Sequence, residues 1–413
     1  MSKRNIAFAG LGILVLGILL LQIPAIKERV AWRFEVAKIY VQNVINPVGS
    51  VPTAVPNPTS IATSTPVTPT QTAVPTQQAI ETVPVPTSTL EPLPPQAFIT
   101  SPPYEKQSPN NCGPAALSMM LHIFGWNGSQ KDISDVIKPV TGDRNVNPEE
   151  LAYWVRNYAG WLRIEYRVGG DLDTLKRLVS KGYPVIIEGT TSLNPDDTGW
   201  PDDDLWAAHY LLVTGYDDAT QTFTVQDAYR GPDQKVEYTK TLDEWKPFNY
   251  LYIVLYLPDQ EEEMKGLLGS NWDPDLNRQN SLAASEAATI TDPSDSFAWF
   301  NLGSNLVYFE RYDEANVAYD KARELGLPQR MFRYQFGPFL ANFHAHRTDD
   351  LLVLTDYALQ RTQMSEETWL WHGWALYRKD DVKGAVENWR KALSVHPGYE
   401  DALYALSFVG ATP

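Results

Sequence analysis

The chain has one cysteine, Cys112, in a setting that suits a nucleophile. Apolar residues follow it with helical spacing, at Leu117, Met120, Leu121 and Phe124. This periodicity predicts a helix from Cys112 to Trp126, with Pro114 in its first turn, where proline is favoured. Cys112 would then begin the helix, where the helix dipole lowers the pKa of a thiol and favours the reactive thiolate.

A thiolate nucleophile needs a base within hydrogen-bond reach, and an imidazole is the natural choice. Of the six histidines, four lie in the C-terminal region, namely His344, His346, His372 and His396. His122 follows Cys112 by ten residues on the same predicted helix, which places it about 15 Å away along the axis. His209 is therefore the candidate base.

His209 begins an apolar strand pattern that ends at Tyr216, and a turn around Asp218 leads to a second strand and then Asp227. A hairpin centred near Asp218 would place His209 directly opposite Asp227, with Cβ atoms about 5 Å apart. A carboxylate in that position orients an imidazole for proton transfer. A register slip of one residue would put the two side chains on opposite faces.

Gln107 precedes the cysteine by five residues, in the loop that leads into the predicted helix. Its side-chain amide and the backbone N–H of Cys112 could together donate hydrogen bonds to the oxyanion of a tetrahedral intermediate. A surface loop position is the alternative for Gln107 taken alone.

The elements around these residues indicate an α+β domain over residues 97–258. Helical patterns come first and β-branched and aromatic strand patterns follow, which favours helices packed on an antiparallel sheet. The expected helices are Cys112–Trp126, Pro148–Ala159 and Asp171–Ser180, and the expected strands are Tyr183–Glu188, His209–Tyr216, Thr222–Gln226 and Leu251–Leu257.

The N-terminal region predicts export and anchoring. After Lys3 and Arg4 an apolar run extends from Ile6 to Ile26, long enough to span a bilayer as a helix. We expect an uncleaved single-pass signal anchor in the cell membrane within residues 1–45, with the remainder extracytoplasmic; a cleaved signal is the alternative. Residues 46–96 are rich in Pro and Thr with almost no charge, which is typical of a disordered, extended stalk.

After a linker at residues 259–271, residues 272–413 repeat internally. Positions Trp299, Gly303, Ala315 and Tyr319 recur 70 residues later as Trp369, Gly373, Ala385 and Trp389. The pattern resembles tetratricopeptide (TPR) repeats, helical pairs of about 34 residues, with a degenerate copy between the two around Phe336–Ala358. We expect an all-α solenoid of roughly three repeats, closed by a helix over Asp401–Phe408.

The net charge and the cysteine count exclude some classes of binding partner and of metal or disulfide site. A formal net charge of -16 argues against binding to nucleic acid. A single cysteine excludes an internal disulfide and any zinc site with several thiolates, and we predict neither cofactor nor metal.

The segment Asn194–Asp204 carries five aspartates, which indicates a solvated loop. The alternatives are a lip of a substrate cleft that favours basic peptides, or a weak Ca²⁺ site.

The segments QSPNNCGPAALSMML, HYLLVTGYDD and VQDAYRG resemble papain-fold cysteine peptidases of the bacteriocin-processing, double-glycine-leader type, and more closely their stand-alone relatives. The resemblance covers about 160 residues. It implies Cys112 as nucleophile, His209 as base and acid, Asp227 as the orienting residue and Gln107 in the oxyanion hole. Asn111 stands where an aspartate commonly precedes the cysteine, and Ala228 where a proline commonly follows the third residue. Neither departure removes a catalytic group.

These observations predict a membrane-anchored extracytoplasmic cysteine peptidase that cleaves peptide or protein substrates. Its TPR concave surface would recruit a protein partner or the substrate. An amidase or transglutaminase-like acyl transferase with the same triad is one alternative, because the triad does not distinguish water from an amine acceptor. A non-catalytic binding scaffold is the other.

Overall fold

The computed structural model describes residues 23–45, 47, 49–55, 91–140, 142–195, 198 and 202–413. The expected membrane span falls almost wholly on residues 1–22, and most of the expected stalk falls on residues 56–90, both outside the described residues. Within the described part of the chain, no helix combines the length and the apolar character that a bilayer crossing requires. The first described helix is α2, Pro24–Ile45.

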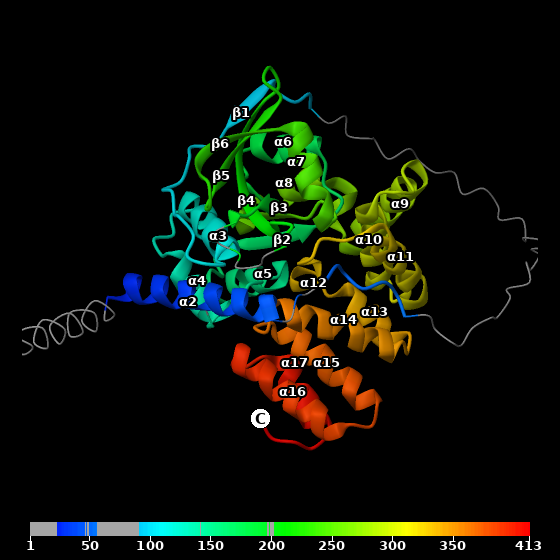
Figure 1. The fold of residues 1–413 in the computed structure, drawn as a ribbon. Coiled ribbons are helices and arrows are strands. Elements are labelled where there is room, and N and C mark those ends of the chain that lie inside the picture. Colours follow the sequence, from blue (N-terminus) through cyan, green and yellow to red (C-terminus); the bar gives the residue numbers. More distant parts are fainter. Residues whose placement is uncertain are drawn as a thin grey trace, which may run out of the picture.

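A seven-stranded antiparallel sheet organises the first domain (Figure 1). Its strand order is β2-β7-β3-β4-β5-β6, and β1 pairs with the end of β4. The strands are β1 Gln96–Phe98, β2 Arg163–Arg167, β3 Val185–Ser192, β4 Trp206–Asp217, β5 Thr222–Asp227, β6 Gly231–Glu237 and β7 Tyr252–Tyr256.

Both faces of the sheet are buried because its central strands are apolar on both sides. On β4, Tyr210 and Leu212 join one hydrophobic core, whereas Leu211 and Val213 join a second core on the opposite face. Helices α3 Cys112–Ile123, α4 Gln130–Ile137 and α5 Pro148–Tyr158 cover the first core. Helices α6 Leu172–Ser180, α7 Tyr238–Trp245 and α8 Glu261–Leu268 cover the second (Figure 1).

The expected helices and strands of this domain are confirmed to within a few residues, and the α+β class with them. The sequence patterns missed β1, β2, β6, α4 and α7. β6 is an edge strand whose polar residues are mostly exposed, so it lacks the apolar alternation that identifies a strand. β2 is short and starts with an exposed arginine.

The expected linker at residues 259–271 is instead largely helical. Three short elements follow β7, namely the 3₁₀ turns Pro258–Gln260 and Gly269–Trp272 and, between them, α8. Met264 and Leu268 are spaced by one helical turn and are buried in the second core. This burial makes α8 part of the first domain.

The C-terminal region is helical and its two matched copies pack alike. Gly303 lies against the ring of Tyr319, and Gly373 lies against that of Trp389, so closely that a Cβ on either glycine would fall within 2.6 Å of the ring. The helices are α9 Pro274–Thr291, α10 Ser296–Tyr308, α11 Tyr312–Leu325, α12 Met331–Tyr334, α13 Gly337–His344, α14 Thr348–Arg361, α15 Glu366–Arg378, α16 Val382–Val395 and α17 Glu400–Phe408. The expected intermediate copy is the α13–α14 hairpin, and the closing helix is α17.

Residues 49–55, which the sequence assigns to the extended stalk, are instead packed on the helical region. Val51 is buried in its core. The guanidinium of Arg323 donates to the carbonyl oxygens of Pro52 and Thr53 and pairs with the buried carboxylate of Asp350. A buried arginine needs such acceptors to compensate its desolvation, which explains why a segment without a core of its own is ordered here.

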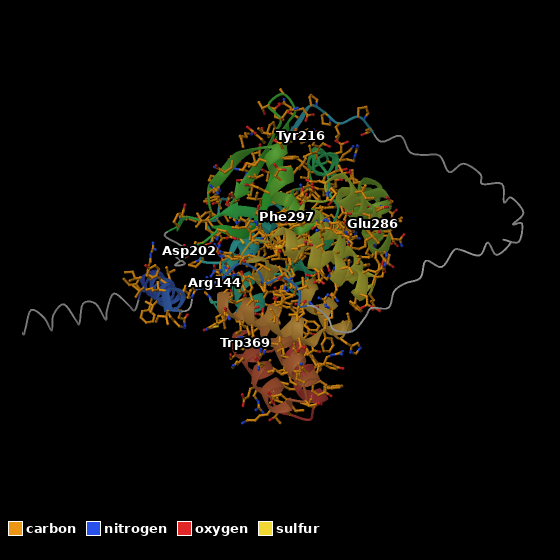
Figure 2. The ribbon with its side chains drawn as sticks, turned by 45° about the vertical axis from the view of Figure 1, so that its right-hand side comes forward. Arg144, Asp202, Tyr216, Glu286, Phe297 and Trp369 are labelled. Carbon is orange, nitrogen blue, oxygen red and sulfur yellow. The ribbon has the colours of Figure 1, made fainter. Side chains whose placement is uncertain are left out.

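The helical region also contacts the loop before β4. Arg330 is buried, pairs with Asp203 and donates a 2.9 Å hydrogen bond to the carbonyl oxygen of Trp206. The backbone N–H of Gln329 donates to Asp204. These two aspartates of the acidic segment therefore hold the two domains together, a role that the sequence did not indicate. Figure 2 shows Tyr216 in the sheet domain, Trp369 in the helical region and Arg144 at the level where they meet.

Candidate active site

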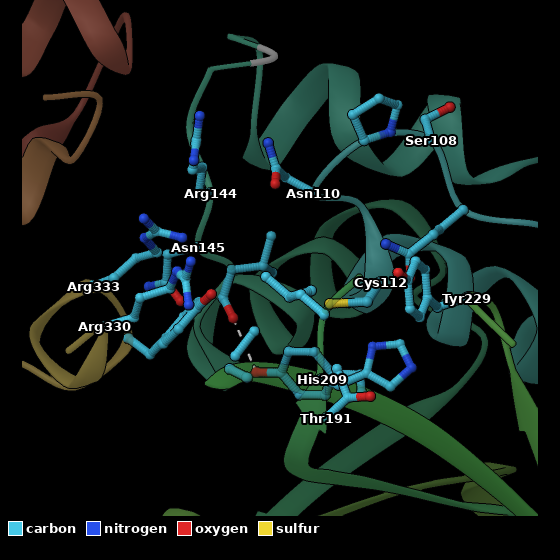
Figure 3. Close-up of a pocket in the computed structure, with 18 of the residues that line it drawn as sticks. Ser108, Asn110, Cys112, Arg144, Asn145, Thr191, His209, Tyr229, Arg330 and Arg333 are labelled. Carbon is cyan, nitrogen blue, oxygen red and sulfur yellow. Dashed lines mark hydrogen bonds between the residues drawn. The ribbon is translucent and has the colours of Figure 1, made fainter. Parts of the chain in front are cut away.

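A cavity of about 710 Å³ lies where the sheet domain meets the helical region. The first domain contributes Gln107, Cys112 and His209, and the helical region contributes Arg330, Arg333 and Tyr334 from the α12 segment. In Figure 3, Cys112, His209 and Tyr229 lie on one side and Arg330 and Arg333 on the other. Arg33 of α2 also lines the cavity.

Cys112 is the first residue of α3, as the sequence predicts, and its side chain is partly buried. The loop before it is fixed by Asn111, whose amide donates a 2.8 Å hydrogen bond to Oε1 of Gln130. Gly113 lets the start of the helix approach β4, because a Cβ there would lie 3.2 Å from the ring of Tyr210. This close approach sets the thiol beside His209.

His209 lies on β4 and Asp227 ends β5, and both side chains are buried. Nε2 of His209 lies 2.7 Å from Oδ1 of Asp227, which leaves Nδ1 to act on the Cys112 thiol, whose pKa His209 lowers. The same carboxylate oxygen accepts from the backbone N–H groups of Tyr229 and Arg230, at 2.8 and 3.0 Å. The carboxylate is therefore held rigidly and in turn holds the imidazole.

The predicted hairpin register was wrong by two residues. The ladder pairs Leu212 with Gln226, and a bulge lies between Val213 and Gly215. His209 is consequently diagonal to Asp227 instead of directly opposite. A two-residue shift preserves the alternation of side chains, so both still project to the same side, and the long imidazole spans the diagonal.

The pKa values of the three groups support an ion pair. Burial raises the pKa of the Cys112 thiol, but the hydrogen bond and charge of His209, the backbone N–H of Tyr210 and the charge of Lys138 bring it below its ordinary value. Burial lowers the pKa of His209, but Asp227 and Cys112 outweigh burial and raise it to about 9. The pKa of Asp227 is lowered, because its hydrogen bond to His209 and its backbone donors outweigh burial. Near neutral pH these directions favour thiolate and imidazolium.

Gln107 lies in the same cavity, where its backbone N–H donates to the carbonyl oxygen of Ala228 at 2.9 Å. Its side-chain Oε1 is buried and has no hydrogen-bond partner among the described residues. The backbone anchor positions Gln107 beside the segment that follows Asp227. Gln107 and Cys112 therefore line the same cavity.

His122, which the sequence excludes as a base, contacts the carbonyl oxygen of Gly128 at 2.8 Å. Three contributors to the site were missed. Glu188 is a buried acid in an otherwise apolar strand pattern, and that pattern was an available signal. The backbone of Tyr210 helps to lower the pKa of the thiol. Arg330 enters from the helical region, which no local pattern could indicate.

The residues around this site match a family model. Residues 99–253 match the model of the Peptidase_C39 like family. These residues form a C39-like peptidase domain with a cysteine peptidase fold, and a helical region follows it. A comparison with curated protein sequences finds no match.

Three solved structures show distant similarity. A putative C39-like peptidase from Bacillus anthracis is 17% identical, with a TM-score of 0.31, over 39% of this chain and 97% of that one. A double glycine motif protease from an AMS/PCAT transporter, in complex with the leader peptide, is 16% identical, with a TM-score of 0.27, over 39% and 98%. YrrB, a TPR protein with an unusual peptide-binding site, is 18% identical, with a TM-score of 0.20, over 36% and 96%.

Proposed function

We propose that this protein is a cysteine peptidase that cleaves peptide bonds with Cys112, His209 and Asp227. One observation carries the proposal: the Cys112 thiol, the His209 imidazole and the Asp227 carboxylate form a series in which His209 lies 2.7 Å from Asp227 and lowers the pKa of the thiol, and the thiol lines a cavity of about 710 Å³. That series has the geometry of an activated nucleophile whose base is oriented by a third group. The C39-like domain match over residues 99–253 agrees with it.

In the proposed reaction the Cys112 thiolate attacks the carbonyl carbon of the scissile bond and forms a carbon–sulfur bond. Gln107 and the N–H of Cys112 donate hydrogen bonds to the resulting oxyanion. The His209 imidazolium then gives its proton to the departing amine as the carbon–nitrogen bond breaks. His209, now neutral, takes a proton from water, the hydroxide displaces the thiolate, and the ion pair is restored.

The proposal extends to the C-terminal helices, which we assign as TPR repeats that recruit a protein substrate or partner. The paired helices and the matched Gly303 and Gly373 contacts support the assignment. Arg330 and Tyr334 line the cavity that holds Cys112, so these helices also shape the cleft itself. A substrate bound there would contact both domains at once.

We also propose that the protein is anchored in the cell membrane by its apolar N-terminal run and that both domains lie outside the cytoplasm. The basic start, the run from Ile6 to Ile26 and the Pro/Thr-rich segment after it support this topology. Protease protection of intact cells tests it. Digestion of both domains without lysis is expected, and their protection would contradict the topology.

The test of the activity combines a thiol-directed peptide probe with product analysis. The wild type should be labelled once, at Cys112, and should release new peptide termini from a mixed peptide library. Cys112→Ala should do neither, because the nucleophile is gone while the fold keeps a small buried side chain. Mass spectrometry reads both results. An unlabelled wild type, or identical products from both proteins, would contradict the proposal.

Added primary amine separates hydrolysis from acyl transfer. Hydrolysis predicts free carboxyl termini in the products, whereas acyl transfer predicts amide adducts. Adducts as the main product would replace the peptidase with an acyl transferase that uses the same residues.

Replacing Gln107 with alanine should lower kcat for peptide hydrolysis by about 10²- to 10³-fold, the usual loss when one oxyanion donor is removed. KM should change little, since the oxyanion exists only along the reaction path. The alkylation rate of Cys112 should stay near that of the wild type, because His209, which remains in place, lowers the pKa of the thiol. Equal loss of alkylation and hydrolysis would instead assign Gln107 a purely structural role.

A further inference from the structure

A second group of reactive side chains lies at the domain junction, apart from the triad. Glu150 from α5, Glu366 from the start of α15 and His396 after the end of α16 each bring one potential ligand atom to the group. These three atoms lie within 4.8 Å of one another. The first domain thus supplies one ligand and the helical region supplies two.

Further acidic residues surround this group. Asp143 and Glu367 lie alongside it, close enough for their charges to act on Glu366 and Glu150. Asp143 and Glu366 are 3% and 2% exposed. The charges of His396 and of the nearby Lys138 both act on Asp143. Ionised carboxylates this close together in a protein interior repel one another, and a bound cation would relieve that repulsion.

One carboxylate oxygen of Glu366 is buried without a hydrogen-bond partner among the described residues, as a ligand of an absent cation would be. Its Oε1 lies 3.1 Å from Nδ1 of His396, whereas its Oε2 is buried with no hydrogen-bond partner among the described residues. The neighbouring carboxylates do have donors: Oε2 of Glu150 accepts from the N–H of Asn147 at 2.7 Å, and Oε1 of Glu367 accepts from the amide of the same residue at 2.7 Å. The orphaned oxygen is therefore specific to Glu366.

We propose that Glu150, Glu366 and His396 bind a divalent transition-metal ion of the Zn²⁺ type. One imidazole with two carboxylates suits such an ion, while Ca²⁺ and Mg²⁺ prefer ligand sets made of oxygen alone. Ligands about 2.0–2.2 Å from zinc are separated from one another by about 3.4 Å. Small side-chain movements would close the present spacing to that value.

The ion would join the two domains and fix one wall of the catalytic cleft. Residues 143–147 run from Asp143 to the cap of α5, and Arg144, Asn145 and Val146 among them line the cavity of Cys112. Figure 3 shows Arg144 and Asn145 on that wall. The carbonyl oxygen of Val146 also accepts a 2.9 Å hydrogen bond from Tyr210. Metal binding would thus be linked to cleft geometry, although the site itself does not depend on the proposed peptidase function.

The test uses the full-length, untagged chain with Cys112→Ala, because the thiolate and His209 would compete for zinc. After removal of metal with EDTA, Zn²⁺ alone is titrated by calorimetry, followed by Mn²⁺, Ca²⁺ and Mg²⁺ in separate runs. One Zn²⁺ per chain is expected, at least about tenfold tighter than Ca²⁺. Glu366→Gln and His396→Gln should each weaken zinc binding at least about tenfold, whereas His372→Gln, at a histidine that contacts Asp356 and Asn388, should not.

Absence of zinc binding, preference for Ca²⁺ or Mg²⁺, or unchanged binding in both site variants would each overturn the proposal. If a site variant fails to fold, the thermal unfolding midpoint of the Cys112→Ala chain, which keeps all three proposed ligands, still tests the proposal. EDTA should lower its midpoint and Zn²⁺ should restore it, since an ion that binds only the folded state stabilises it. A midpoint that does not respond to either treatment would also overturn the proposal.

Discussion

Replacement of His209 by alanine should lower kcat/KM for peptide hydrolysis by about 10⁴-fold or more, the order of loss seen when the base of such a catalytic unit is removed. The change removes the proton donor of the leaving amine and also the group that stabilises the thiolate. Burial would remain and would raise the pKa of Cys112, because the opposing hydrogen bond and charge of the imidazole would be gone.

The alkylation of Cys112 checks this prediction without knowledge of the substrate. Because the chain has one cysteine, the mass increase with iodoacetamide reports that thiol alone. At pH 6.5 the wild type should react at least about tenfold faster than His209→Ala, since only the thiolate is nucleophilic. His372→Ala, which changes a histidine of the helical region, should match the wild type. Equal alkylation rates in all three proteins would show that His209 does not activate the thiol.

Replacement of Asp227 by asparagine should lower kcat/KM by about 10²- to 10⁴-fold and move the alkaline limb of its pH profile to lower pH. In the wild type the active ion pair needs a thiolate, which is lost as pH falls through the lowered pKa of Cys112. It also needs an imidazolium, which is lost as pH rises through the pKa of His209 at about 9. The profile should therefore be bell-shaped.

The shift follows from the part that Asp227 plays in raising the pKa of His209. Its hydrogen bond and its charge act against burial, which lowers that pKa. An amide keeps the shape but loses the charge, so the imidazolium should deprotonate well below pH 9. Asp217→Asn is the matched control, because Asp217 ends β4 on the same hairpin and its carboxylate accepts a turn N–H at 2.9 Å. An alkaline limb that stays near pH 9 in Asp227→Asn would contradict the assigned role.

The sequence signals for the candidate site are local. A helix start can be recognised from proline and apolar spacing, and α3 begins at Cys112 as expected. His209 was identified as the candidate base because His122 lies too far along its helix and the other four histidines lie in the C-terminal repeat region.

The hairpin was found from strand patterns around a turn, although its register was wrong. The turn is centred between Ala219 and Thr220 instead of at Asp218, and a bulge between Val213 and Gly215 shifts the ladder back by one residue, which no alternation pattern reveals.

The sequence did less well where a segment depends on a distant partner. Residues 49–55 have the composition of a disordered stalk, and Arg323 orders them from 270 residues away. The acidic segment before β4 has the composition of a solvated loop, and Arg330 pairs with two of its aspartates. In both cases the partner is a buried arginine, whose need for acceptors becomes apparent only once the helices are packed.

The sequence by itself determined the chemistry of this protein: one thiol at a helix start, one imidazole free to reach it, a carboxylate on the adjoining strand, and a repeat of helical pairs. Those features follow from residue type and short-range spacing. Only the tertiary structure decided that the helical region forms a wall of the cavity that holds Cys112 and that Glu150, Glu366 and His396 meet at the junction. Contacts between residues more than 200 positions apart depend on how the domains dock, and no local periodicity records that geometry.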